Sequence, residues 1–164
     1  MSPLYLAVGA VAALRLAELA YAARNRRRLL ARGGREVGVR HYPLLVALHA
    51  GWLAAMVAFV PPETVPNGPL LGLFAALQAL RLWVIVSLGA RWTTRIVVVP
   101  GAPLVRRGPY RWLRHPNYWV VATEIVVLPA AFGAWALALV FGALNLLLLR
   151  HRIGVEERAL GLSP

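Results

Sequence analysis

The chain has 164 residues, and its 18 arginines and 6 glutamates give it a formal net charge of +12. It contains no Lys, Asp or Cys, which excludes a disulfide framework, a cysteine metal site, a Schiff base and a phosphate-binding Gly-Lys-Ser/Thr loop. Hydrophobic residues make up 60% of the chain and occur in long runs, a pattern typical of an integral membrane protein. The four histidines show no metal-ligand spacing, so no metal site is expected.

Five apolar segments are predicted to form transmembrane helices, because a bilayer core takes roughly 20 apolar residues as helix. The last two segments are short and meet around Pro129 and Gly133. We therefore expect them to form a tight helical hairpin, lengthened at its cytoplasmic end by residues 112–116 and 150–153, with one long broken helix as the alternative. The predicted spans are 4–23, 43–60, 70–90, 117–132 and 134–149.

The arginines lie mostly outside these spans. Seven fall between the first and second spans, six between Arg91 and Arg114, and three after the last span, whereas residues 61–69 contain none. The positive-inside rule then predicts an outside N-terminus and a cytoplasmic C-terminus. This topology explains most of the positive charge without a nucleic-acid partner.

A few polar side chains interrupt the predicted spans. Arg15 and Glu18 are three residues apart on one helix, so they can form an ion pair that faces the other helices. His49, Gln78 and Arg81 are expected to contact one another between the second and third helices, where polar groups stabilise helix packing.

Glu124 lies deeper in the fourth span. It follows Asn117 by seven residues and Tyr118 by six, so the three residues share roughly one helix face, two turns apart. A carboxylate there would line any pocket that begins at Tyr118. The sequence leaves a functional role and a structural ion pair equally open for Glu124.

A polar stretch precedes the fourth span. Residues 89–103 are predicted to be a loop with a short extended segment at 96–99, where β-branched residues precede Pro100-Gly101. Pro116 suits the first turn of a helix, which places Arg114, His115 and Tyr118 at its N-terminus. This group is either an interfacial anchor or part of a binding site.

A second polar stretch, "RHRIGVEERAL", follows the last span and contains Glu156 and Glu157. If the hairpin closes, both stretches emerge together on the cytoplasmic side. Arginine can hold a carboxylate and glutamate can hold an ammonium, so the pair of stretches suits a zwitterionic ligand. The alternative is a solvated helix end in which Glu and Arg balance each other.

These two stretches resemble the isoprenylcysteine carboxyl methyltransferase family of membrane enzymes that use S-adenosylmethionine. The resemblance covers about residues 88–160 and is closest to the short bacterial branch, whose members are similar to enzymes that methylate lipid-like molecules such as alkylpyrones. The residues that carry it are Gly108-Pro109-Tyr110-Arg111, Arg114-His115-Pro116-Asn117-Tyr118, Arg152-Ile153 and Glu156-Glu157 with Leu160.

The apolar spans predict one all-α membrane domain over residues 1–164, with three spans in 1–90. The resemblance adds a catalytic loop to residues 91–164, which also contain the helical hairpin and the Glu-Glu segment. It also implies a cytoplasmic cofactor pocket for S-adenosylmethionine, walled by the ends of the last two helices. Arg111 or Arg114 would orient an anionic acceptor oxygen, and Glu124 or His115 would act as base if one is needed. The implied cofactor-binding residues are Tyr110, His115, Tyr118, Arg152, Glu156 and Glu157, with Arg152 bracing the glutamates.

The expected reaction is methyl transfer to a carboxylate, enol or phenol oxygen of a lipophilic acceptor in a bacterial inner membrane. Family members that act on prenylcysteine usually continue past the Glu-Glu motif with an amphipathic tail that bears Tyr and Arg. This sequence instead has only Gly161-Leu162-Ser163-Pro164 after that motif, which argues against a prenylcysteine substrate. Two alternatives stay open. Membrane sterol reductases have a similar Arg-His-Pro-Asn-Tyr block and use NADPH, and a non-enzymatic lipid-binding protein would bind neither cofactor.

Overall fold

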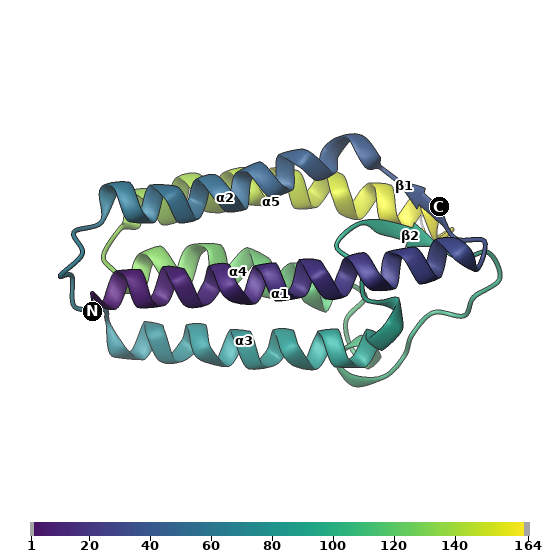
Figure 1. Ribbon diagram of the computed structural model, residues 1–164, viewed down its shortest axis with the longest axis horizontal. Helices are drawn as coiled ribbons and strands as arrows, with labels where there is room; N and C mark the ends of the chain where they lie inside the picture. Colours follow the sequence, from purple (N-terminus) through teal and green to yellow (C-terminus); the bar gives the residue numbers. More distant parts are fainter. Residues whose placement is uncertain (1, 163–164) are drawn as a thin grey trace.

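The computed structural model describes residues 2–162 as a bundle of long helices with one small antiparallel sheet (Figure 1). Single-turn 3-10 helices occupy Val39–His41, Gly89–Arg91 and Gly108–Arg111. The predicted all-α architecture is therefore confirmed. The long helices are α1 (Pro3–Ala31), α2 (Tyr42–Phe59), α3 (Gly68–Leu88), α4 (Pro116–Ala131) and α5 (Trp135–Ala159), and the strands are β1 (Arg35–Val37) and β2 (Ile96–Val98).

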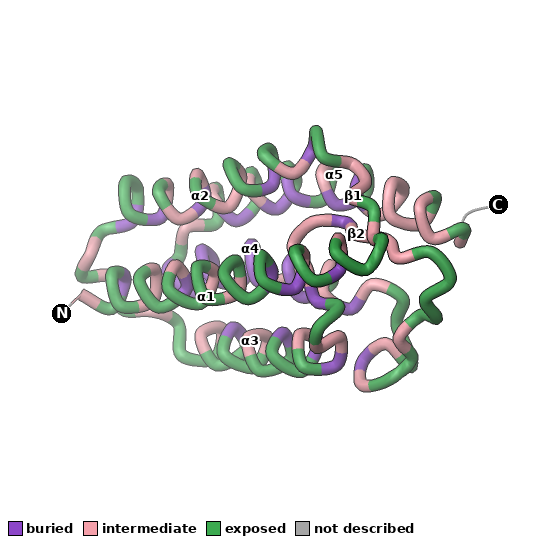
Figure 2. Tube along the Cα trace, turned by 45° about the vertical axis from the view of Figure 1, so that its right-hand side comes forward, coloured by how far each residue is buried: buried purple, intermediate pink, exposed green. Residues whose placement is uncertain are grey.

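Four helices, α1, α2, α3 and α5, are long and apolar enough to cross a membrane. Helix α4 has 16 residues, and at about 1.5 Å per residue it falls short of a hydrocarbon core of about 30 Å. The prediction of five spans is thus supported for four of them. Side chains exposed on these helices include Leu16, Leu82 and Leu147, each more than 60% exposed, and Figure 2 shows exposed positions along the outer faces. Such apolar surface suits contact with lipid.

Helices α4 and α5 form the predicted hairpin, joined by a turn at residues 132–134 (Figure 1). The expected extension of α4 over residues 112–116 is wrong, because the helix begins at Pro116. Proline restricts the residue before it to non-helical conformations, and His115 has φ −128° and ψ 58°. Helix α5, in contrast, continues beyond Ile153 to Ala159 and carries Glu156 and Glu157 on its last turns.

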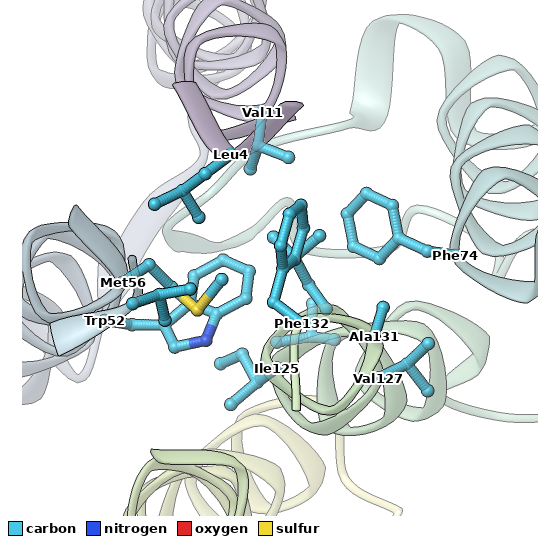
Figure 3. Close-up of a cluster of buried hydrophobic side chains, with 12 residues drawn as sticks. Leu4, Val11, Trp52, Met56, Phe74, Ile125, Val127, Ala131 and Phe132 are labelled. Carbon is cyan, nitrogen blue, oxygen red and sulfur yellow. The ribbon is translucent and has the colours of Figure 1, made fainter. Parts of the chain in front are cut away.

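The main apolar core lies between α1, α2, α3 and α4, near the end of the bundle that holds the N-terminus (Figure 3). Trp52, Leu4, Met56 and Ile125 are its largest almost fully buried members, none more than 2% exposed. Close helix packing also depends on Gly142, where a Cβ atom would come within 2.9 Å of the Val126 side chain on α4. Small residues permit such approach of membrane helices.

The arginine-rich segments lie together at the opposite end of the bundle. The α1–α2 connection, the α3–α4 loop and the end of α5 meet there, while the N-terminus and the α2–α3 loop lie at the other end (Figure 1). The predicted extended segment at 96–99 is confirmed as β2, which pairs with β1 in the register Glu36 to Val97. The pairing with β1 was not predicted. The two strands tie the α3–α4 loop to the α1–α2 connection.

Glu36 reinforces this sheet through two arginines. Its carboxylate accepts hydrogen bonds from Arg26 Nε at 2.6 Å and from Arg95 Nη1 at 2.5 Å. Burial acts to raise the pKa of Glu36, but the hydrogen bonds from Arg95 and Arg26 outweigh burial and lower it below the ordinary value. The ionised carboxylate therefore favours the folded loop.

We expect Glu36→Gln to loosen the sheet, because a hydrogen bond to a charged group contributes about 1.5–3 kcal/mol. Faster amide exchange at Ile96 and Val98 would report the change. In the unmodified protein, protection should be complete above the ordinary carboxyl pKa of about 4.3 and fall as the pH drops through the lowered pKa of Glu36. Exchange in the variant should lack this acid step, and an equal step in both proteins would contradict the assignment.

Candidate functional site

The candidate site begins at the N-terminal end of α4. Pro116 starts the helix, and the side chain of His115, just before it, stacks on the ring of Tyr118 with centroids 5.4 Å apart and an interplanar angle of 24°. The two rings form one wall of the site at the arginine-rich end of the bundle. The structure therefore keeps together the two residues that the sequence placed at a helix start.

Helix α5 brings two carboxylates to this wall. The Tyr118 hydroxyl donates to Glu156 Oε2 at 2.5 Å, and His115 Nε2 lies 3.2 Å from Glu157 Oε1. His115 Nδ1 is 3.7 Å from Glu156 Oε2. The predicted meeting of the two polar stretches is confirmed, because α4 and α5 run antiparallel and bring their sequence-distant ends together. We call His115, Tyr118, Glu156 and Glu157 the His-Tyr-Glu-Glu cluster.

Arg152 supports this cluster through a tyrosine. Its Nε donates to the Tyr118 hydroxyl at 2.8 Å, and its Nη2 donates to the carbonyl of Thr94 at 2.7 Å. The sequence predicted that Arg152 would brace the glutamates, and the geometry places Tyr118 between Arg152 and Glu156. The Thr94 carbonyl was not foreseen, since a main-chain acceptor leaves no signal in residue identity.

The loop before α4 contributes unevenly to the site. Burial, then the charge of Glu156, raises the pKa of Tyr110, whose ring packs against the small apolar cluster that contains Val84 and Trp92. Arg111 is exposed and lies over the ring of Trp112, 5.6 Å from its centroid, and Arg114 is also exposed. The structure therefore brings Tyr110 toward the His-Tyr-Glu-Glu cluster but leaves Arg111 and Arg114 at its outer surface.

Two side chains hold this loop against the bundle. Asn25, which is fully buried on α1, donates from Nδ2 to the carbonyl of Trp92 at 2.9 Å. Arg107 Nε donates to the carbonyl of Ser87 at 2.7 Å, at the end of α3. Sequence reasoning missed Asn25. The sequence offered one sign of its role, because Asn25 is the single uncharged residue in the arginine run at 24–28.

The polar side chains inside the membrane form a separate cluster. Glu124 is 1% exposed and accepts hydrogen bonds from Arg81 Nη1 at 3.0 Å, Gln78 Nε2 at 2.9 Å and Arg15 Nη2 at 3.3 Å. Glu18 bonds Arg15 and Arg81, which confirms the predicted Arg15–Glu18 pair. We call Arg15, Glu18, Gln78, Arg81 and Glu124 the intramembrane ion cluster. It joins α1, α3 and α4 and has no net charge.

This cluster decides one open alternative and corrects one prediction. For Glu124 the sequence left open a pocket-lining role and a structural ion pair, and the structure shows the ion pair, because its oxygens are engaged by α1 and α3. Gln78 and Arg81 were expected to contact His49, but they bind Glu18 and Glu124, and His49 Nδ1 instead lies 2.8 Å from the carbonyl of Leu45. Burying a carboxylate without a cation costs more free energy than burying a neutral imidazole without a hydrogen-bond partner, so the arginines bind the glutamates. The sequence could have indicated this network, because the predicted spans contain two arginines and two glutamates, which balance in charge.

Comparison with known proteins gives a consistent result. The model of the isoprenylcysteine carboxyl methyltransferase (ICMT) family matches residues 70–161. The chain is 39% identical to "Uncharacterized protein YpbQ" of Bacillus subtilis (strain 168) over 89% of each chain. It is 28% identical to an "Uncharacterized protein" of Haemophilus influenzae (strain ATCC 51907 / DSM 11121 / KW20 / Rd), over 92% of this chain and 90% of the relative. No solved structure matches it.

Proposed function

The chain belongs to the isoprenylcysteine carboxyl methyltransferase family and is therefore a membrane methyltransferase, and from that premise we propose that it transfers a methyl group from S-adenosylmethionine to an oxygen of a lipophilic acceptor. The observation that carries this proposal is the His-Tyr-Glu-Glu cluster, in which α4 and α5 bring an imidazole and a phenol against two carboxylates. That donor set suits the amino acid end of the cofactor.

The residues at the cluster fit such a ligand. The side chains of Glu156 and Glu157 keep 26% and 27% of their surface exposed, so both carboxylates can accept hydrogen bonds from an ammonium group. Asn117, the residue before Tyr118 on α4, has a buried Oδ1 with no hydrogen-bond partner among the described residues. A buried acceptor of this kind favours a ligand that brings N–H groups.

When bound, S-adenosylmethionine supplies a methyl group attached to a positively charged sulfur. The Tyr118 ring stacks on His115, and the guanidinium of Arg152 lies over the same ring, 5.7 Å from its centroid, so the position of the tyrosine is fixed. Arg152 holds the Tyr118 hydroxyl, which in turn holds Glu156, so the carboxylate keeps one orientation. Alignment of this kind contributes up to about 7–11 kcal/mol to a transfer reaction.

The acceptor decides whether a base is required. A carboxylate is already ionised at neutral pH, whereas a phenol with a pKa near 10 benefits from a base. His115 is the better placed of the two candidates, because the oxygens of Glu124 are engaged in the intramembrane ion cluster. Arg111 and Arg114 are exposed at the same end of the bundle, where they would orient an anionic oxygen. We place this end at the cytoplasmic face, following the positive-inside rule.

One labelling experiment tests the proposal. Membranes that contain the protein, incubated with methyl-labelled S-adenosylmethionine, should yield a labelled lipid extract, and control membranes without the protein should not. A label that is released by mild alkali would identify a methyl ester and hence a carboxylate acceptor. Binding of NADPH without binding of S-adenosylmethionine would instead indicate a reductase, and binding of neither would indicate a lipid-binding protein.

A further inference from the structure

A basic groove lies beside the candidate site and has no part in the proposed methyl transfer. It has a volume of about 530 Å³ and opens between the start of α2 and the end of α5. Its polar lining consists of Arg40, His41 and His151, and its apolar lining of Val39, Leu44 and Val155, with Gly38 at one edge. We call it the His41 groove.

The imidazole of His41 is the central feature of this groove. It is only 7% exposed, and its Nε2 is buried without a hydrogen-bond partner among residues 2–162. The ring of His151 stands edge-on to it, with centroids 5.3 Å apart. Leaving a buried polar nitrogen unpaired is unfavourable, so a ligand that hydrogen-bonds to it would bind more tightly.

Gly38 lies directly against this imidazole. Its φ is +67°, a left-handed conformation that glycine adopts without strain, and a Cβ atom there would collide with the His41 ring and touch Val155 on α5. The backbone therefore lies closer to the ring than any residue with a Cβ atom would permit. The conformation of the loop between β1 and α2 therefore fixes the position of the imidazole.

The charges around His41 indicate what the groove binds. Two of the side chains near its ring, Arg152 and His151, are basic residues. Arg40, which also lines the groove, adds a guanidinium. Three basic groups and an unpaired imidazole with no carboxylate among them favour an anion with several acceptor oxygens.

The apolar lining indicates that the anion is attached to an apolar chain. Val39 and Leu44 are 51% and 57% exposed and lie where the apolar span of α2 begins, at the arginine-rich end. A ligand in the groove would therefore meet basic side chains with its head and lipid-facing side chains with its tail. We propose that the His41 groove binds the phosphate headgroup of an anionic amphiphile. This site uses His151 and Val155, one residue before Arg152 and Glu156 respectively, so it occupies the neighbouring face of α5.

The test follows the four imidazoles of the detergent-purified protein by NMR, with assignments from single His→Gln variants. Dioctanoyl phosphatidic acid should shift the resonances of His41 and His151 saturably and leave His49 unchanged. Inorganic phosphate and uncharged dioctanoylglycerol serve as separate probes. A saturable shift with inorganic phosphate at equal affinity would support the same anion site but assign it to the free ion instead of a headgroup.

Variants on the exposed rim make the test specific, because they avoid the buried ring. Arg40→Gln and His151→Gln should each weaken phosphatidic acid binding about tenfold, the effect of losing one charge-assisted hydrogen bond. Arg106→Gln, in an exposed part of the α3–α4 loop, is the matched control and should bind like the unmodified protein. The proposal is overturned if dioctanoylglycerol shifts His41 equally, if no shift saturates, or if Arg40→Gln and Arg106→Gln bind alike.

Discussion

Replacing Glu124 with alanine is expected to lower the free energy of unfolding by about 3–5 kcal/mol, because it leaves two arginines buried with one carboxylate between them. Arg81 is 7% exposed and loses its bond to Glu124, while Arg15 and Gln78 lose theirs on the same oxygen. Thermal melting of the detergent-purified protein, followed by tryptophan fluorescence, measures the loss.

A matched set of variants separates charge balance from packing. Glu63→Ala removes an exposed carboxylate in the α2–α3 loop and should leave the melting temperature unchanged. The double variant Arg81→Leu with Glu124→Leu keeps the Arg15–Glu18 pair and removes one charge of each sign. It should therefore be destabilised by less than the sum of the two single changes. Additive losses, or a normal melting temperature for Glu124→Ala, would show that the cluster does not act as one unit.

Replacing Glu156 with alanine is expected to weaken the binding of labelled S-adenosylmethionine roughly 30-fold or more, since loss of one partner of a hydrogen-bonded charge pair costs about 2 kcal/mol or more. In the structure Glu156 accepts from Tyr118 and lies 3.7 Å from His115, so it stands at the centre of the cluster. Equilibrium binding in detergent measures the effect.

The same preparation must be shown to fold before the loss is interpreted. Glu156→Ala should melt near the unmodified protein, because its carboxylate is partly exposed. Glu63→Ala again provides a control, with unchanged cofactor affinity. If Glu156→Ala binds the cofactor as tightly as the unmodified protein, the assignment of the cluster to the cofactor fails, whatever the lipid acceptor proves to be.

The candidate site was accessible to sequence reasoning because each half is contiguous in the chain. His115 and Tyr118 surround the proline that starts α4, and Glu156 and Glu157 follow the last apolar run. A hairpin between the two halves was enough to predict that they meet. The role of Arg152 was predicted only in part, because the choice between Glu156 and Tyr118 as its partner depends on side-chain direction.

The ion cluster shows the limit of the same reasoning. The Arg15–Glu18 pair is local, and helix geometry alone predicts it. Glu124 and Arg15 are 109 residues apart, and their contact depends on which faces α1, α3 and α4 turn to one another. Hydropathy gives the length of a membrane helix but not its rotation, which packing against neighbours decides.

Sequence by itself determined that this protein lies in a membrane, that its arginines gather at one end and that two polar stretches meet there. These properties follow from local hydropathy, from the distribution of charge between spans and from short motifs at helix ends. Tertiary structure alone decided the partners of Glu124, the pairing of β1 with β2 and the burial of His41 Nε2 without a partner in the described part of the chain. Each of these depends on the rotation and approach of elements distant in the chain, and no local pattern encodes that geometry.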